Sequence, residues 1–265
     1  MKWIRTAVVL AAALGVAGCA VSPTGRDQLV MFSPSAMNQM GAAAFDEIKT
    51  ETPAAGAYLD RYVECVADAV VAVLPGDQSQ GWEVEVFDKD EPNAFALPGK
   101  KIGVFKGLLD VADRQDQLAA VIGHEIGHVL AQHGNERMSS QFVVGTGLAV
   151  AAAMMRRRES NEGRHAMALL GLGAQVGILL PYSRSHETEA DRIGLELMAK
   201  AGFDPAASVE LWQNMSQLGG ARPPEFLSTH PSNRTRIRAL QAQVPAATKV
   251  YREAKAAGRV PECDG

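Results

Sequence analysis

The sequence predicts a mainly helical domain with a small β-sheet, of the α+β class, and three observations lead to this expectation. Several long segments place apolar residues three and four positions apart, as amphipathic helices do. Short segments between residues 82 and 105 instead have the alternation and the turn residues of strands. Residues 114 to 133 are apolar on most sides and are expected to form a helix within the core.

The expected elements follow one another without a repeat of 20 to 50 residues, which favours a single domain. Residues 21 to 40 mix Ser, Pro, Thr, Gly and Gln without periodicity, and we expect a tether there. Pro98 and Gly99 indicate a hairpin between the last two strands. We expect helices at about 56–74, 114–133, 185–201, 205–218 and from 231 onwards, and strands at 82–87, 93–97 and 101–105.

Two apolar stretches rich in Gly and Ala, residues 141 to 155 and 166 to 180, flank the polar segment RRRESNEGR. Each is shorter than the 18 or more residues of a membrane span. Two interpretations stay open: ordinary core helices with glycines for close packing, or a helical hairpin that covers the functional site or touches a bilayer.

The N-terminus has the layout of a secretory signal, because two basic residues precede an apolar stretch at residues 7 to 17. The stretch ends in VAGC, which resembles the bacterial lipobox, in which the cysteine is lipidated and becomes the new N-terminus. We therefore expect Cys19 to carry lipid in the periplasm. Ala20, rather than Asp, favours the outer membrane by the usual lipoprotein sorting pattern. The alternative is an ordinary secreted protein with a free Cys19.

With Cys19 assigned to lipid, Cys65 and Cys263 remain of the three cysteines. In an oxidising periplasm these two can form a disulfide that joins the C-terminal tail to an N-terminal helix. Two unpaired thiols are the alternative, because sequence alone does not establish proximity.

The charge of the chain argues against a nucleic-acid partner. The formal net charge is -4 and the pI is about 5.9. A chain with this balance has no basic field to attract phosphates.

The segment GHEIGHVLAQH, residues 123 to 133, predicts a metal site on the core helix. His124 and His128 lie four residues apart, so on a helix they share a face and both imidazoles can reach one ion. Glu125 lies about 100° round the helix, which suits a base that takes a proton from water at the metal. The alternative is a pair of core histidines that bind no metal.

His133 is not expected to join this site while the helix continues. It lies nine residues after His124, which turns it to the opposite face. Metzincins solve this with a glycine and a later ligand, but Ala131 and Gly134 occupy those places here. The third ligand must therefore come from another segment.

Residues 183 to 202, SRSHETEADRIGLELMAKAG, can supply that ligand. An apolar helical stripe through Ala190 and Gly194 extends backwards to His186 and Glu187, while Glu189 belongs to the opposite stripe and is expected to face water. A buried carboxylate with no basic residue on its own face needs a cation, so Glu187 is the expected ligand. His186 is the rival ligand, and a surface position for Glu187 is the remaining alternative.

Two further residues of this helix have expected roles in supporting the site. Asp191, one turn after Glu187, is suited to accept a hydrogen bond from a ligand histidine. Gly194 would let the two helices approach closely.

Two histidines and a glutamate with an open fourth position describe a catalytic zinc site. The segments HEIGHVLAQH, SRSHETEAD, NAFALPG and STHPSNRTRI resemble the motif set of the M48 metallopeptidases over residues 45 to 243. These gluzincins include CAAX prenyl proteases, HtpX-like membrane proteases and periplasmic BepA-like or lipoprotein members, and the last group is expected to be the most similar. The resemblance implies one Zn²⁺ per chain, with Glu125 as general base and Asp191 behind the ligands His124, His128 and Glu187.

The resemblance also gives a role to NAFALPG. It is similar to the family's edge strand beside the cleft, where an extended substrate adds as a further strand. Asn93, Ala94, Phe95 and Ala96 are then expected to bind substrate. The family usually has a second glycine where this chain has Lys100, which leaves the turn open.

In STHPSNRTRI, His230 precedes Pro231 and is biased to an extended backbone that could direct its ring at the cleft. In related enzymes a histidine here can stabilise the oxyanion or move onto the metal and close the site, so the resemblance implies a catalytic role. Arg236 matches the family's arginine six residues later and is expected to orient a partner or form a salt bridge.

Taken together, these features predict a zinc endopeptidase tethered to the membrane in the periplasm, with unfolded or misassembled envelope proteins as substrates in protein quality control. The expected organisation is a signal peptide (1–18), a lipidated N-terminus and tether (19–44), the metallopeptidase domain (45–243) and a C-terminal tail (244–265).

Two other classes stay open. One is a periplasmic chaperone or assembly factor in which zinc only braces two helices. The other is a protein that acts inside the bilayer, which the short apolar stretches and the lipobox disfavour. The sequence predicts neither the oligomeric state nor whether the resting enzyme is latent.

Overall fold

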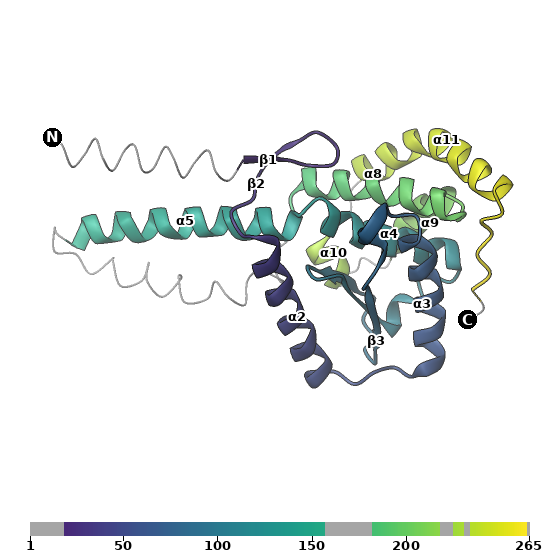
Figure 1. The fold of residues 1–265 in the computed structure, drawn as a ribbon, viewed down its shortest axis with the longest axis horizontal. Helices are drawn as coiled ribbons and strands as arrows, with labels where there is room; N and C mark the ends of the chain where they lie inside the picture. The colour runs from purple at the N-terminus through teal and green to yellow at the C-terminus, as the bar shows by residue number, and fades with distance from the viewer. Residues whose placement is uncertain (1–18, 157–181, 218–224, 231–233, 264–265) are drawn as a thin grey trace. The chain divides into compact units, whose positions relative to one another are not determined.

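The computed structural model describes residues 19–156, 182–217, 225–230 and 234–263, and within them the predicted mainly helical fold with small sheets is confirmed (Figure 1). The chain divides into two compact units. The core unit consists of residues 35–131 and 181–265, and the second unit consists of residues 1–34 and 132–180. The core unit contains α2 (Pro34–Glu51), α3 (Ala57–Val71), β3 (Glu83–Phe87), β4 (Ala94–Leu97), β5 (Lys101–Phe105), α4 (Gln115–Leu130), α8 (Arg184–Ala201), α9 (Ala206–Gln217), α10 (Glu225–Thr229) and α11 (Arg234–Ala256).

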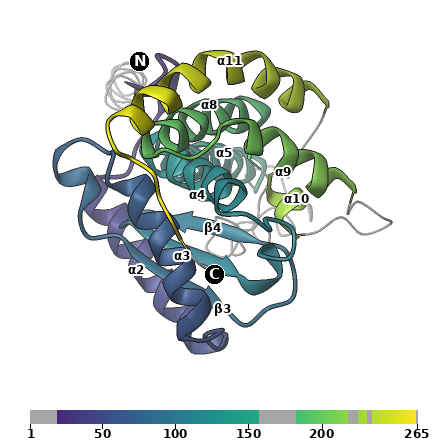
Figure 2. The same cartoon turned by 90° about the vertical axis from the view of Figure 1, so that its right-hand side faces the viewer.

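The three strands of the core unit form one sheet in the order β3-β5-β4, with β3 parallel and β4 antiparallel to β5. Alternate side chains face opposite sides, as the pleat requires. On one face Phe87, Phe95 and Phe105 pack with Phe45 of α2. The other face joins the main core with α3 and α4, and Figure 2 shows α4 lying next to β4.

The predicted hairpin between β4 and β5 is present. Its turn shows how Lys100 is accommodated where the family usually has a second glycine. Gly99 and Lys100 both have positive φ, at 88° and 62°. This conformation is easy for glycine and costs a residue with a side chain about 1 kcal/mol. The Lys100 ammonium donates to the carbonyls of Asp77 and Gln80, and these bonds hold it in the turn.

Helices α4 and α8 pack at very short range because glycines lie where they cross. A Cβ at Gly194 would lie 2.6 Å from the backbone nitrogen of His124 and 2.8 Å from the carbonyl carbon of Gly123. Gly127 of α4 faces Ala190 of α8 in a similar way. The predicted role of Gly194 is therefore found in the structure.

Replacing Gly194 by alanine should force α4 and α8 apart. We expect a loss of about 1–3 kcal/mol in the free energy of unfolding, the usual cost of overpacking, together with weaker metal binding. Urea unfolding and metal content after dialysis would measure the two effects. Thr188→Ala, on the exposed face of α8, is the control; a Gly194→Ala protein that matches it would contradict the prediction.

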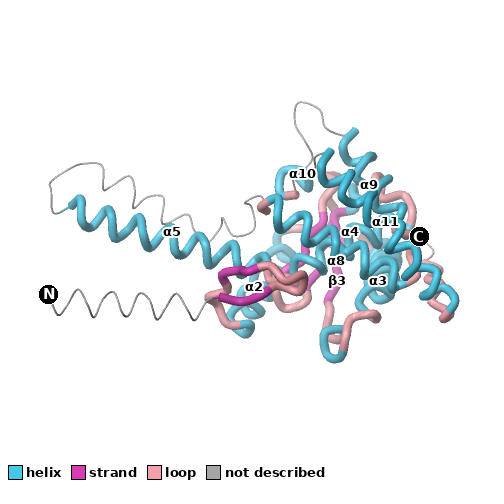
Figure 3. Tube along the Cα trace, turned by 90° about the horizontal axis from the view of Figure 1, so that it is seen from above, coloured by secondary structure: helices cyan, strands magenta, loops and turns pink. Residues whose placement is uncertain are grey.

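The second unit corrects the expected tether at residues 21 to 40. In this unit β1 (Cys19–Val21) pairs with β2 (Asp27–Leu29), as Figure 3 shows in magenta, and α5 (His133–Arg156) packs beside β2. Arg26 forms a salt bridge with Glu136 of α5 at 2.6 Å. Helix α2, which belongs to the core unit from residue 35 onwards, already begins at Pro34, so most of the segment predicted to be a tether has regular structure.

The first apolar stretch, residues 141 to 155, lies in α5, whereas the second, 166 to 180, lies outside the described residues, as does the predicted signal at 1–18. Among the described helices, none combines the length and the hydropathy that crossing a membrane would require.

The C-terminal segment differs from the expected tail because α11 continues through residue 244 to Ala256. Beyond it, Cys263 and Cys65 of α3 form a disulfide, with their Cα atoms 5.7 Å apart and a sequence separation of 198. The side chain of Gln115 bonds the carbonyl of Pro261 and the amide of Cys263. The end of the chain is therefore held against α3 and the start of α4.

Removing this disulfide should lower the free energy of unfolding by about 4 kcal/mol, because it closes a very long loop in the unfolded chain. Denaturant unfolding of a Cys65→Ser, Cys263→Ser double variant would measure this loss. A reducing agent should destabilise the wild type to the same extent and leave the double variant unchanged. Equal stability of the two proteins under oxidising conditions would contradict it.

Candidate active site

Helix α4 supplies three side chains of the site, all buried: His124, Glu125 and His128. Its sequence is apolar on most sides, so it lies inside the core unit with the sheet on one side and α8 on the other. The four-residue spacing brings the two imidazoles together, with His124 Nε2 3.1 Å from His128 Nε2. The structure therefore places these two residues as the sequence predicted.

Helix α8 brings Glu187 to the same point. Ser183 caps the helix by accepting a hydrogen bond from the amide of His186, which fixes the first turn that carries Glu187. Glu187 is 1% exposed, and its two carboxylate oxygens lie 3.4 Å from His128 Nε2 and 3.6 Å from His124 Nε2. Glu187, and not the rival His186, faces the histidines of α4.

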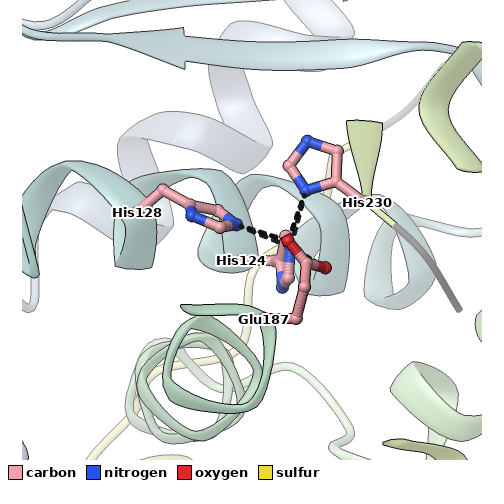
Figure 4. Close-up of side chains that lie close together, drawn as sticks. All are labelled: His124, His128, Glu187 and His230. Atoms are coloured by element: carbon pink, nitrogen blue, oxygen red, sulfur yellow. Dashed lines mark hydrogen bonds and ion pairs between the residues drawn. The ribbon is translucent and has the colours of Figure 1, made fainter. Parts of the chain in front are cut away.

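His230 completes the cluster. It follows α10 directly and is buried. Its Nδ1 lies 3.3 Å from His124 Nε2 and 3.1 Å from Glu187 Oε1. Figure 4 shows the four side chains pointing toward one another, and one ligand atom from each lies within 4.8 Å of all the others.

The spacing of these atoms fits a zinc ion. Zinc bonds to imidazole nitrogen and carboxylate oxygen are about 2.0–2.2 Å long, so the ligand atoms of a tetrahedral site lie about 3.3–3.6 Å apart. Five distances between ligand atoms of these side chains, with Glu187 counted at either oxygen, run from 3.1 to 3.6 Å. Three imidazoles and a carboxylate in a buried position are also a ligand set that zinc prefers.

Asp191 and Arg236 support the ligands from behind. Asp191 Oδ1 lies 3.0 Å from His124 Nδ1, the ring nitrogen that faces away from the cluster. The Arg236 guanidinium bonds both oxygens of Asp191, at 2.7 and 2.8 Å, and also contacts Glu187. This arrangement can orient the His124 ring, which is the role expected of Asp191.

The carboxylates of Glu187, in the cluster, and of Asp191, behind it, are held ionised. Burial alone would raise the pKa of Glu187, but the imidazoles of His128 and His230 bring that pKa well below its ordinary value. Burial would likewise raise the pKa of Asp191, and the Arg236 charge and hydrogen bonds lower it. Burial lowers the pKa of His128 well below its usual range, so this imidazole is neutral and can bind a metal.

Glu125 has a different environment, as a proton acceptor requires. It lies beside the cluster, with Oε1 3.5 Å from His230 Nε2, and Oε2 accepts a hydrogen bond of 3.2 Å from the amide of Ala96. Burial raises the pKa of Glu125, which brings it closer to neutral pH. A carboxylate of this kind can take up and release a proton during a reaction.

Among the described residues, β4 forms one edge of the three-stranded sheet, and it faces this site. The amide of Phe105 donates to the carbonyl of Asn93, so in the antiparallel ladder Phe95 also pairs with β5. The main-chain groups of Ala94 and Ala96 therefore point to the outer edge, and the bond from Ala96 to Glu125 agrees with this. Asn93 is buried, and its Oδ1 has no hydrogen-bond partner in the structure.

Two sequence-based expectations near the site need correction. His133 lies outside the cluster, as expected, but the reason is different: α4 ends at Leu130, Gln132 has a φ of 54°, and His133 begins α5. Glu189 was expected to face water and is 5% exposed. The pattern of one helix shows which residues share a face, but not what packs against that face.

Three aromatic residues that no sequence pattern singled out contact the cluster. The Tyr182 ring is stacked on His128 with 3.9 Å between centroids, and Phe226 is stacked on His230 at 4.6 Å. Trp212 packs edge-on against His124 and carries the Arg236 guanidinium 4.1 Å above its ring. Trp212 lies in a helix that was predicted, whereas Tyr182 precedes α8 and Phe226 lies in α10, a helix that was not predicted. No sequence pattern indicated that these three residues would face the site.

A buried HExxH helix joined by a glutamate from a later helix defines a metallopeptidase of the gluzincin type. The sequence pattern of peptidase family M48 matches residues 53–244, close to the predicted range of 45–243. The chain therefore belongs to peptidase family M48.

Relatives with known names include mitochondrial and bacterial proteins. The chain is 40% identical over 72% of its length to the mitochondrial metalloendopeptidase OMA1 of Schizosaccharomyces pombe, and 36% identical over 73% to the Bos taurus protein of that name. It is 29% identical over 68% to the β-barrel assembly-enhancing protease of Yersinia pestis, so this bacterial protein is less similar than those two mitochondrial ones. The chain covers 55% of the first of these relatives and 37% of each of the others.

Proposed function

We propose that the chain is a zinc-dependent endopeptidase that hydrolyses peptide bonds of unfolded or misassembled proteins in the cell envelope. The observation that carries the proposal is the buried cluster of His124, His128, Glu187 and His230 with Glu125 beside it. Membership of family M48 supports the reaction class.

The residues of the site can divide the reaction among them. When bound, one zinc ion would polarise the scissile carbonyl and acidify a water molecule. Glu125 takes the proton as that water attacks, and then gives it to the nitrogen of the leaving amine. His230, once it moves away from the ligand position, can donate a hydrogen bond to the oxygen that gains negative charge.

The edge of β4 can bind the substrate main chain. An extended peptide would pair with the outward main-chain groups of Ala94 and with the carbonyl of Ala96, whose amide already donates to Glu125. Main-chain pairing reads backbone more than side chains, so exposure of an extended segment would decide what is cut. Unfolded proteins offer such segments, which is why we propose them as the substrate class.

We place the enzyme at the periplasmic face of the outer membrane, held by lipid on Cys19. The support is the basic and apolar N-terminal sequence and its VAGC end, together with the similarity to bacterial β-barrel assembly-enhancing proteases. Labelling of cells with a radioactive fatty acid tests this proposal. Cys19→Ser should abolish the label and release the protein from the membrane fraction.

The position of His230 favours two states that an experiment can separate. With His230 as a fourth protein ligand the site is closed, as in a latent enzyme or in a structural zinc site of an assembly factor. We propose the latent enzyme. The experiment measures zinc content and casein cleavage for the wild type and for His230→Ala.

Zinc near one per chain, with cleavage that appears or increases in His230→Ala, supports a latent peptidase. Cleavage in the wild type that is lost in His230→Ala supports a peptidase in which His230 acts on the oxyanion. Bound zinc without cleavage in either protein would favour the assembly-factor interpretation, and absence of bound metal would refute the site.

A further inference from the structure

Tyr182 contacts two members of the cluster, although the proposed mechanism does not use it. Its half-buried ring is stacked on the His128 imidazole, with 3.9 Å between centroids and 28° between planes. The same ring lies 5.2 Å from the His230 ring at a tilt of 35°. One side chain therefore touches both a ligand on the rigid helix α4 and the ligand that follows α10.

His230 contacts two aromatic rings. Phe226, one turn earlier, is stacked on one side with centroids 4.6 Å apart and planes 28° apart. Tyr182 lies 5.2 Å away. Contacts between rings at such distances favour particular orientations. Because α10 has only five residues, these rings add to the contacts with His124 and Glu187 in orienting His230.

The main chain connects the same two positions. The amide of Tyr182 donates to the carbonyl of Thr229, the residue before His230, at 3.0 Å. On its other side Tyr182 precedes Ser183, whose hydroxyl caps α8. The backbone of Tyr182 is thus fixed to the start of the helix that carries Glu187, and its hydrogen bond holds the backbone before His230.

We propose that Tyr182 is a positioning residue that keeps His230 Nδ1 directed at the metal, and so sets how readily His230 leaves to open the fourth position. The ring acts by packing against both His128 and His230. The hydrogen bond from the Tyr182 amide to the Thr229 carbonyl holds the start of α8 beside the residue before His230. This inference rests on the proposed metal site and adds to it a residue that controls the closed state.

The test observes metal coordination directly. Zn²⁺ has a filled d shell and no visible d–d spectrum, so the chain is loaded with Co²⁺ instead. Absorption spectra and the rate of metal release to a chelator are recorded for the wild type, His230→Ala, Tyr182→Leu and Tyr182→Phe. Leucine keeps side-chain bulk without a ring, and phenylalanine keeps the ring. Tyr62→Leu, a partly buried tyrosine of α3 outside the site, is the matched control.

We expect Tyr182→Leu to shift the cobalt spectrum toward that of His230→Ala and to release the metal about tenfold faster, the lower end for loss of a group that supports a ligand. Tyr182→Phe and Tyr62→Leu should match the wild type. If His230→Ala changes the spectrum and Tyr182→Leu does not, the proposal for Tyr182 is wrong while the metal site stands. If the wild type binds no cobalt or zinc, the metal site itself fails. If the spectrum of His230→Ala is unchanged, His230 does not bind the metal, and the role proposed for Tyr182 is overturned.

Discussion

Replacing Glu125 by glutamine is expected to lower the rate of peptide-bond cleavage by about a hundredfold to ten-thousandfold, the contribution of a positioned general base. The amide oxygen of glutamine can still accept the hydrogen bond from Ala96. It cannot take a proton from water at neutral pH. Because Glu125 lies beside the four ligand atoms and not among them, metal content and the free energy of unfolding should stay close to the wild-type values.

Casein cleavage is measured for Glu125→Gln against the wild type, which tests the closed site. It is also measured for the double variant His230→Ala, Glu125→Gln against His230→Ala, which tests the opened site. Glu196→Gln, on the exposed face of α8, is the control for loss of a carboxylate. Cleavage by the double variant His230→Ala, Glu125→Gln at the rate of His230→Ala alone would refute the mechanism. Loss of metal from Glu125→Gln would instead show that Glu125 is needed to form the site.

Replacing Arg236 by methionine is expected to destabilise the core unit by about 3–5 kcal/mol, the cost of leaving a buried charge without its partner. Arg236 is 4% exposed and is shared by Asp191 and Glu187. Its guanidinium also packs on the Trp212 ring. Without it, the buried carboxylates of Asp191 and Glu187 would lose the cation that they share, and one would have to take up a proton.

Urea unfolding of the metal-free protein would measure this loss, since bound zinc would add its own stabilisation. Arg238→Met is the matched control, because Arg238 lies two residues further along α11 and is exposed, so its loss should change stability by less than about 0.5 kcal/mol. Equal stabilities of the two variants would show that the carboxylates find another partner. Asp191→Asn combined with Arg236→Met should recover part of the loss.

The ligands on α4 and α8 could be predicted because each depends on periodicity within one helix. His124 and His128 follow from a spacing of four, and Glu187 from a stripe that also contains Gly194. The roles of β4 and His230 came only from the resemblance to the family. No physical pattern along the chain indicates that residue 230 folds back onto residue 124.

The errors arose where a pattern was weak or depended on other elements. In α2 the buried residues Met37, Gly41 and Phe45 are four apart. Glycine adds no apolar side chain to this stripe, so the start of the helix was assigned to the tether. The burial of Glu189 depends on segments that pack against α8, and the periodicity of α8 alone does not predict them. Tyr182 was missed because it precedes its helix and contacts a histidine that comes 54 residues earlier.

The disulfide also joins the two halves of the site by a covalent bond. Cys65 precedes the histidines of α4, and Cys263 follows Glu187 and His230. One cut at any peptide bond between residues 131 and 181 would divide the ligands between two fragments that remain linked. Such a nicked molecule would migrate as a full-length chain on a gel without reductant and as two bands with it. Self-cleavage of this protein must therefore be assayed under reducing conditions.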